Sequence, residues 1–147
     1  MSSNATITTD RLTLRPIQKR DAEAMTAMML GHWEMRGYGL WAVTETGAAD
    51  ILGMVGPFFP DGWPETEIGW VMFDGAEGKG YAFEAAKAAI SDARTRLGWR
   101  DIVHYINPEN SRSIALAERL GAVLDPNAEQ PKPGSHALIY RQPQEAA

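Results

Sequence analysis

Two glycines, Gly78 and Gly80, stand between a strand-like segment and an alanine-rich segment in the stretch EIGWVMFDGAEGKGYAFEAAKAA, residues 67–89. Because glycine lacks a Cβ atom, the backbone at these positions can approach a ligand closely and adopt positive φ angles. A helix that begins directly afterwards presents unpaired N–H groups and a partial positive charge, and both favour a phosphate. The pattern indicates an anion site at a strand-to-helix turn. A glycine turn that only connects the two elements is the alternative.

Two widespread phosphate motifs do not fit this stretch. A P-loop places Ser or Thr after Gly-Lys, whereas Lys79 is followed by Gly80. A Rossmann fingerprint needs a third glycine and a downstream ribose-binding acid, and both are missing. The residues alone therefore predict an anion site without naming the anion.

The elements that must position this turn can be read from periodicity and turn residues. Strands and helices are expected in the order β-α-β-β-β-α-β-α-β, with an extra short strand near Val123. The strands are predicted at 6–16, 39–46, 50–59, 66–74, 101–107 and 136–142, and the helices at 19–30, 81–97 and 110–122. This order predicts an α+β fold with a single mixed, mostly antiparallel sheet flanked by helices. We expect residues 1–147 to form one domain.

Composition narrows the classes of function. The chain has 147 residues, 44% of them hydrophobic, and a net charge of −5, so we expect a folded protein without a nucleic-acid footprint. It contains no cysteine, which excludes disulfides, thiolate metal ligands and cysteine nucleophiles, and we expect no metal. Without a signal pattern or a membrane-length apolar run, a cytoplasmic protein with no membrane partner is predicted.

Several separated motifs resemble the GNAT superfamily of acyl-CoA-dependent N-acetyltransferases. They are a strand, GKGYA (78–82), an alanine-rich helix, another strand and NPENSRSIALAERLGA (107–122). The opening TDRLTLRPIQKRDAEAM and the sequence EIGW are similar to the branch that contains the ribosomal-protein alanine N-acetyltransferases. The resemblance implies the acyl-CoA N-acyltransferase fold, with acetyl-CoA as co-substrate.

The resemblance also implies a set of cofactor contacts. The strand end pairs with the pantetheine arm as an added strand does, the glycine loop holds the pyrophosphate, and two asparagines follow the next strand. These residues are Trp70, Val71 and Met72; Gly78, Lys79, Gly80, Tyr81 and Ala82; and Asn107 and Asn110. The two asparagines also have a structural interpretation, because NPEN is turn chemistry and Asn110 is a good N-cap.

Two departures from the family pattern bear on function. Glu77 occupies a slot that usually holds Arg or Gln, and a carboxylate about 7 Å from a pyrophosphate charge costs roughly 0.6 to 2.4 kcal/mol. We therefore expect weakened but not lost cofactor binding, offset in part if the Lys79 side chain turns toward the phosphates. The alternative is that Glu77 points to solvent. The branch's second helix, which walls the acceptor side, is expected to be absent near residues 30–33, either as a true feature or through a lost segment.

Acetylation of an amine requires removal of a proton. At pH 7 this costs about 4.6 kcal/mol for a lysine and about 1 to 1.4 kcal/mol for an α-amino group. The resemblance places Glu67 at a position where the family often carries a catalytic glutamate, with Glu65 as the runner-up. His104 has a suitable pKa but is expected to pack in a central strand. An exposed strand residue remains the alternative for Glu67.

The leaving thiolate and the oxyanion need less stabilisation by the protein than the deprotonation of the amine does. Ser113 aligns with a serine proposed as the acid in the closer branch, although a serine there is more often a helix cap partner. Ala117 stands where many members have a tyrosine. A strand N–H, that of Val71 or a neighbour, is predicted to bind the developing oxyanion.

The aromatic residues allow two interpretations. Trp41 and Trp70 are expected in the core, whereas Trp33, Tyr38 and Trp63 either shape the acceptor pocket or pack structurally. Arg36 is a further candidate for contact with acceptor charge.

Three functional classes follow. The first is an enzyme that moves acetyl from acetyl-CoA to a primary amine, at a protein N-terminus or on a small molecule, by direct attack. The second is an acyl-CoA-binding module without catalysis, and the third is a scaffold that uses the fold to form a homodimer.

Overall fold

The computed structural model describes residues 6–18 and 23–145 of the chain, and residues 19–22 of the first predicted helix lie outside them. Eight strands form one sheet in the order β1-β2-β3-β4-β5-β6-β8-β7. The strands are β1 Ile7–Thr8, β2 Leu12–Arg15, β3 Trp41–Glu45, β4 Ile51–Phe58, β5 Glu67–Met72, β6 Val103–Ile106, β7 Val123–Leu124 and β8 Leu138–Arg141. The helices are α1 Glu23–Arg36, α2 Tyr81–Arg96 and α3 Ser111–Arg119. The predicted fold class is confirmed.

All neighbouring strands run antiparallel except β5 and β6, which are parallel and share the single register pair Glu67 and Val103. The predicted strand over 6–16 is wrong in one respect, because it is a hairpin of β1 and β2. The hydroxyl of Thr9 accepts a hydrogen bond from the Leu12 N–H at 3.0 Å, and the Thr9 N–H donates to the Leu12 carbonyl at 2.9 Å, so these two local bonds close the turn. Ile7 and Leu12 are five residues apart, so the apolar alternation changes phase across the turn, and this change was the available signal.

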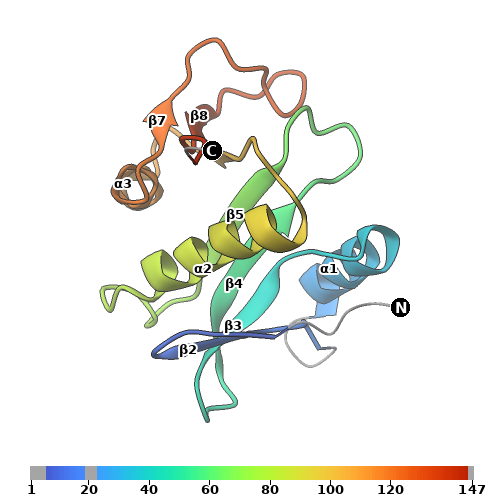
Figure 1. Cartoon of the computed structure of the whole chain (residues 1–147), viewed down its shortest axis with the longest axis vertical. Coiled ribbons are helices and arrows are strands. Elements are labelled where there is room, and N and C mark those ends of the chain that lie inside the picture. The colour runs from blue at the N-terminus through green and yellow to red at the C-terminus, as the bar shows by residue number, and fades with distance from the viewer. Residues whose placement is uncertain (1–5, 19–22, 146–147) are drawn as a thin grey trace.

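The main core lies between α2 and the sheet. Helix α2 crosses β4, β5 and β2, and Figure 1 shows it lying over one face. Its buried face is built of small side chains, Ala85, Ala86, Ala89 and Ala93, which let the helix lie close to the sheet. Met29 of α1 packs with Ala42 and Met54. Those two residues alternate with Trp41, Val43 and Val55 of the α2-facing core, so Met29 covers the opposite face.

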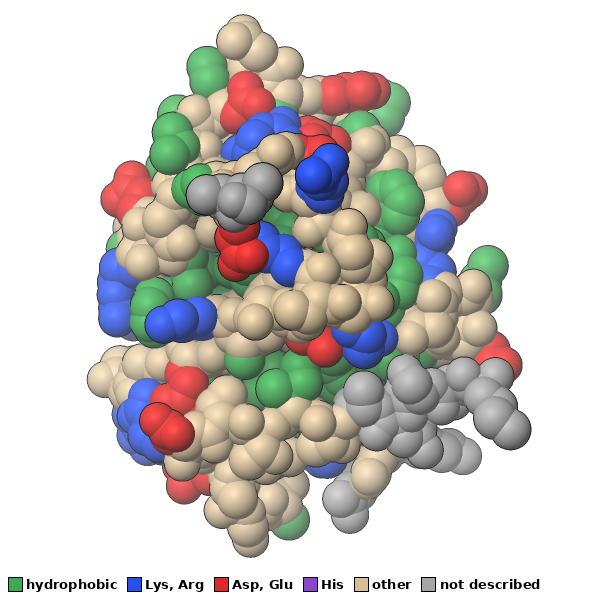
Figure 2. Space-filling view, viewed as in Figure 1, with side chains coloured by type: hydrophobic (Ala, Val, Ile, Leu, Met, Phe, Trp, Pro, Cys, Tyr) green, Lys and Arg blue, Asp and Glu red, His purple; other side chains and the backbone are tan. Residues whose placement is uncertain are grey.

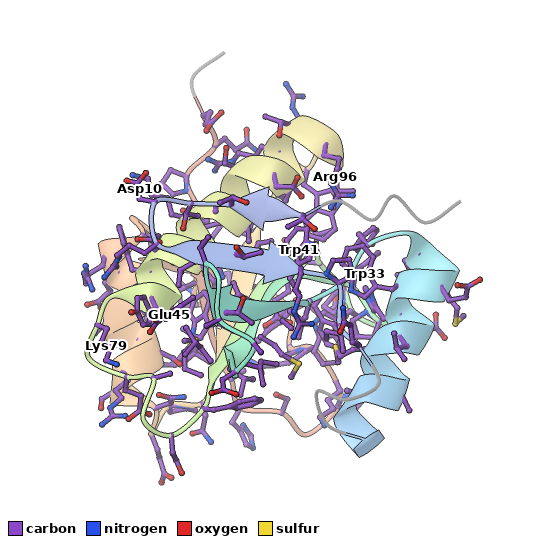
Figure 3. The ribbon with its side chains drawn as sticks, turned by 90° about the horizontal axis from the view of Figure 1, so that it is seen from below. Asp10, Trp33, Trp41, Glu45, Lys79 and Arg96 are labelled. Atoms are coloured by element: carbon purple, nitrogen blue, oxygen red, sulfur yellow. The ribbon has the colours of Figure 1, made fainter. Side chains whose placement is uncertain are left out.

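Helix α1 extends to Arg36, six residues beyond its predicted end. Trp33, an aromatic candidate for the acceptor pocket, is instead a core residue and is 7% exposed. Its indole N–H donates to the carbonyl of Leu40 at 2.8 Å, and its ring meets Trp41 at 5.8 Å. Figure 3 shows Trp33 reaching from α1 toward Trp41. Burial of this indole holds the last turn of α1 in place, although Gly31 lowers the helix propensity of this segment.

Helix α1 connects to the sheet without a further helix. It is the one helix between β2 and β3 in the described part of this connection, and it ends at Gly37, whose φ is +74°. His32 joins it to the β4–β5 loop: Nδ1 lies 2.8 Å from the Tyr38 carbonyl oxygen, and Nε2 accepts the Phe59 N–H at 2.9 Å. Across the described ranges, none of the helices is long and apolar enough to cross a membrane.

Candidate active site

Strands β5 and β6 separate after their single register pair, and this opening is the origin of the site. The Thr66 carbonyl accepts the Val103 N–H, and the Ile68 carbonyl oxygen contacts His104, so the backbone groups of even-numbered residues face β6. The Phe73 N–H bonds Leu52 on the β4 side. Because these directions alternate along a strand, we infer that the N–H groups of Trp70 and Met72 point into the opening. The N–H of Val71 belongs to the β4 ladder, so of Val71 and its neighbours the N–H of Trp70 is left as a candidate to bind an oxyanion.

His104 bridges the two strands beside this opening. It is 1% exposed; its Nδ1 lies 2.7 Å from the Ile68 carbonyl oxygen and its Nε2 lies 2.9 Å from Nε2 of Gln142. A carbonyl can only accept and the Gln142 amide nitrogen can only donate, so the proton is on Nδ1 and Nε2 accepts. Burial lowers the pKa of His104 to about 4. The predicted packing role of this histidine is confirmed.

The glycine loop adopts the backbone that its sequence predicts. Gly78 and Gly80 have φ angles of +77° and +75°, and Gly80 is the N-cap of α2 without a side-chain cap. The first N–H groups of α2 are thus not covered by a capping side chain. From the β1–β2 turn, the Arg11 guanidinium donates to the Lys79 carbonyl at 2.8 Å and to Glu84 of α2 at 2.8 Å. These bonds anchor the loop from outside.

A groove of about 820 Å³ runs between the end of β5, the glycine loop and α3. Of the ten residues that resemblance assigned to CoA, eight line it: Trp70, Val71, Met72, Gly78, Gly80, Tyr81, Ala82 and Asn110. Lys79 is not among the lining residues; its Nζ lies 5.9 Å from the Tyr81 ring centroid, and Tyr81 in turn bonds Glu45. Figure 3 shows Lys79 and Glu45 on the same side of the molecule. The expected turn of the Lys79 side chain toward the groove is therefore not seen.

The two asparagines have structural partners. Oδ1 of Asn110 accepts the Ser113 N–H at 3.1 Å, which confirms it as the N-cap of α3. Oδ1 of Asn107 accepts the Glu109 N–H at 2.9 Å in a turn. Asn107 lines a smaller cavity of about 110 Å³ between β5 and β6, which adjoins the groove because Trp70, Asn110 and Ser113 line both.

Glu67 lies at the small cavity and has the features of a general base. Its side chain is buried, and burial raises its pKa to about 7, despite hydrogen bonds that favour the charged form. Oε2 accepts the indole N–H of Trp63 at 3.0 Å, and the Tyr105 N–H lies 3.4 Å from Oε1. A carboxylate with this pKa can accept and release a proton near neutral pH.

Glu65, the runner-up base, is in a different environment. Its two oxygens accept from Arg141 at 2.6 and 2.9 Å, and Arg141 also pairs with Asp125 at 2.9 Å. The bidentate ion pair with the arginine occupies both oxygens of this carboxylate. The two glutamates, which the sequence alone did not distinguish, therefore have different environments in the structure.

Ser113 and Trp70 are joined across the boundary of the two cavities. The indole N–H of Trp70 donates to Oγ of Ser113 at 3.1 Å, and the Trp70 ring lies 4.7 Å from the His104 ring. Since Ser113 accepts this bond, its own hydroxyl hydrogen can be donated to another group. Ala117 is buried and brings no acid to this position.

Sequence reasoning missed some of the site. It did not assign Trp63 to Glu67, and it did not single out Tyr105, whose hydroxyl is buried without a hydrogen-bond partner within the described residues. Arg112 and Arg119, which line the groove from α3, were also missed. Their seven-residue spacing places both on one face of α3 and was the available signal.

Comparison with known proteins agrees with this geometry. A model of the acetyltransferase (GNAT) domain matches residues 26–123. An acetyltransferase from Agrobacterium tumefaciens strain C58 is 31% identical, with a TM-score of 0.87 over 97% of this chain and 96% of that chain. This chain belongs to the GNAT acetyltransferases, as its sequence predicted.

Two more distant structures share the fold. Ribosomal-protein-S5-alanine acetyltransferase from Vibrio fischeri is 13% identical, with a TM-score of 0.73 over 96% of this chain and 97% of that chain. RimJ from Mycobacterium smegmatis, solved in complex with CoA-disulfide, is 18% identical, with a TM-score of 0.68 over 96% of this chain and 88% of that chain. The neighbours thus include the branch that the sequence resembles, and the fold binds a CoA compound in one of them.

Proposed function

We propose that this protein transfers the acetyl group of acetyl-CoA to a primary amine by direct attack. The observation that carries the proposal is Glu67, a buried carboxylate with a pKa of about 7 beside the opening between β5 and β6. The groove supports the cofactor assignment, because left-handed glycines and a helix N-terminus without a side-chain cap suit a pyrophosphate. The thioester supplies the acetyl group.

Each residue then has one role in the reaction. Glu67 takes a proton from the protonated amine, and the neutral nitrogen then bonds the acetyl carbon and loses its second proton to solvent. The Trp70 N–H, directed into the opening, stabilises negative charge on the carbonyl oxygen. As the carbon–sulfur bond breaks, the Ser113 hydroxyl donates a hydrogen bond to the departing thiolate, which finally takes its proton from water. Glu67 returns its proton to solvent.

The pKa of Glu67 favours one class of acceptor. Proton transfer to a base of pKa about 7 costs about 1 kcal/mol from an α-amino group and about 4.6 kcal/mol from a lysine side chain. We therefore favour acceptors of low amine pKa, such as protein N-termini, over lysine side chains and polyamines. Phe58, Trp63 and Tyr105 pack edge to face beside Glu67 and would form part of the acceptor wall.

An acetylation assay tests the proposal. Purified protein, acetyl-CoA and a panel of peptides, amino acids, polyamines and aminoglycosides should release free CoA thiol with at least one acceptor. Glu67→Gln should bind CoA normally and lose turnover about 100-fold or more at pH 7, whereas the exposed-site control Glu34→Gln should match wild type. Unchanged turnover in Glu67→Gln would remove Glu67 from the mechanism. If acetyl-CoA raises the melting temperature and no amine is acetylated, the protein is an acyl-CoA-binding module.

A further inference from the structure

Glu77 and Arg112 form an ion pair between two walls of the groove. Glu77 belongs to the loop that precedes α2, and Arg112 lies in the first turn of α3. Both residues line the groove. Figure 1 shows α3 and the start of α2 on the same side of the molecule, with the loop below them. The pair therefore joins the loop to α3 at the mouth of the groove.

The charges around the groove are unevenly arranged. Among the described residues that line it, Glu77 is the one acid, and Arg112 and Arg119 are the bases. Figure 2 shows acidic and basic side chains interspersed over the face it displays. Arg119 is engaged with Phe83, its guanidinium carbon 4.6 Å from the ring centroid. Arg112 is thus the cation nearest to the glycine loop from α3, because its partner Glu77 stands directly before Gly78.

We propose that Arg112 binds the pyrophosphate of CoA and that Glu77 holds this arginine across the groove until the cofactor displaces it. This inference rests on the proposed function and assigns to α3 a cation that the loop does not provide. Arg112 is 75% exposed and Glu77 41% exposed at their side chains, and such exposed pairs hold their partners weakly. A guanidinium gains more from the two oxygens of a diphosphate, which it can bind in a fork.

This arrangement confines the charge problem that Glu77 raises to the cofactor-bound state. An unpaired carboxylate beside Gly78 would repel the pyrophosphate. While Glu77 is paired with Arg112, its charge is offset, and the arginine is held beside the glycine loop, where the pyrophosphate would bind. Entry of the cofactor exchanges one anion for another on the same guanidinium. Glu77 therefore acts as a competitor that sets cofactor affinity.

Titration of CoA and its fragments tests the inference. Arg112→Gln should weaken CoA and dephospho-CoA about tenfold, in line with the loss of one charge-assisted contact, and leave pantetheine unchanged. The exposed-arginine control Arg100→Gln should bind all three as wild type does. Glu77→Gln should tighten CoA several-fold, because the competitor is gone. Both changes are at exposed side chains, so an unchanged melting temperature without ligand verifies the fold.

Four results would overturn it. Equal binding by Arg112→Gln and Arg100→Gln would make the ion pair a surface contact only. A loss confined to CoA, with dephospho-CoA unaffected, would place Arg112 at the 3′-phosphate. Weaker binding by Glu77→Gln would show that Glu77 does not compete. Failure of the wild-type protein itself to bind CoA would instead defeat the proposed function, and with it this inference.

Discussion

The indole N–H of Trp63 donates a hydrogen bond of 3.0 Å to Oε2 of Glu67. Burial raises the pKa of Glu67, and this bond acts against burial by stabilising the charged carboxylate. Trp63 therefore positions the proposed base and keeps its pKa close to neutral. Its ring also packs against Tyr105 and Phe58, with centroids at 5.7 and 5.9 Å, so its orientation is fixed from two sides.

Replacement of Trp63 by Phe should move the pH profile of the reaction. The ring contacts remain, but the bond that lowers the pKa is lost, so the pKa of Glu67 should rise by about one unit. The acid limb of kcat/KM plotted against pH should shift upward by that amount. Trp99→Phe, which changes an indole that packs on Tyr38, is the matched control. A Trp63→Phe profile that coincides with wild type would show that this bond does not set the pKa of the base.

Glu67→Gln should stabilise the protein at alkaline pH. The pKa of Glu67 is about 7 in the folded chain against 4.5 in a model peptide, so the folded state binds the extra proton between these values. Stability is consequently lost as pH rises from 4.5 to 7, by up to about 3 kcal/mol above that range. Urea denaturation should show Glu67→Gln more stable than wild type at pH 8 and equal to it near pH 4.5. Equal stabilities of Glu67→Gln and wild type at pH 8 would show that Glu67 is not a buried carboxylate with a raised pKa.

His104 should have the opposite dependence on pH. Its pKa falls from 6.5 to about 4 on folding, so the unfolded chain binds more protons between these values, and stability is lost as pH falls below 6.5. His104→Leu leaves the Ile68 carbonyl and Gln142 without partners and should cost about 2 to 3 kcal/mol at pH 7.5. At pH 5 the difference from wild type should narrow by about 2 kcal/mol. A constant difference at both pH values would mean that His104 does not titrate as its burial requires.

Trp33 should be a stability residue without a part in acceptor binding. Trp33→Ala removes a buried indole and should lower the free energy of unfolding by about 3 to 5 kcal/mol. Met35→Ala is the control on the same helix; Met35 is 85% exposed, so its loss should change stability by less than about 0.5 kcal/mol. Chemical denaturation measures both. A small effect at Trp33 would mean that the last turn of α1 is not held by this indole.

Much of the fold could be predicted because its signals are local. Gly80 and Gly121 mark helix ends by their backbone preferences and Asn110 by its side-chain cap, and all three stand at such ends in the structure. The length of α1 was missed because it depends on a tertiary contact, that between Trp33 and the Leu40 carbonyl. The β1–β2 turn was missed although its signal is local, the change of phase between Ile7 and Leu12.

The site was predictable as a set of positions but not as a set of interactions. Glu65 and Glu67 look alike in sequence, but Arg141, far along the chain, binds Glu65, whereas Glu67 is buried and bonded by Trp63. The pairing of Glu77 with Arg112 likewise requires the fold, since it joins a loop to a helix that lies beyond the next strand. The resemblance to the family located the residues of the groove. The charge environment of the glutamates depends on partners that are distant in the sequence and could not be predicted from it.

The single register pair between β5 and β6 means that the sheet is nearly two sheets. One half carries the hairpins and α2, the other carries α3 and the C-terminal strands, and little backbone bonding crosses the seam. A molecule that lies along the free edge of β5 would take the place of a missing strand and connect the two halves of the sheet. By mass action, the resistance of this protein to unfolding and proteolysis would then rise and fall with the supply of its ligand.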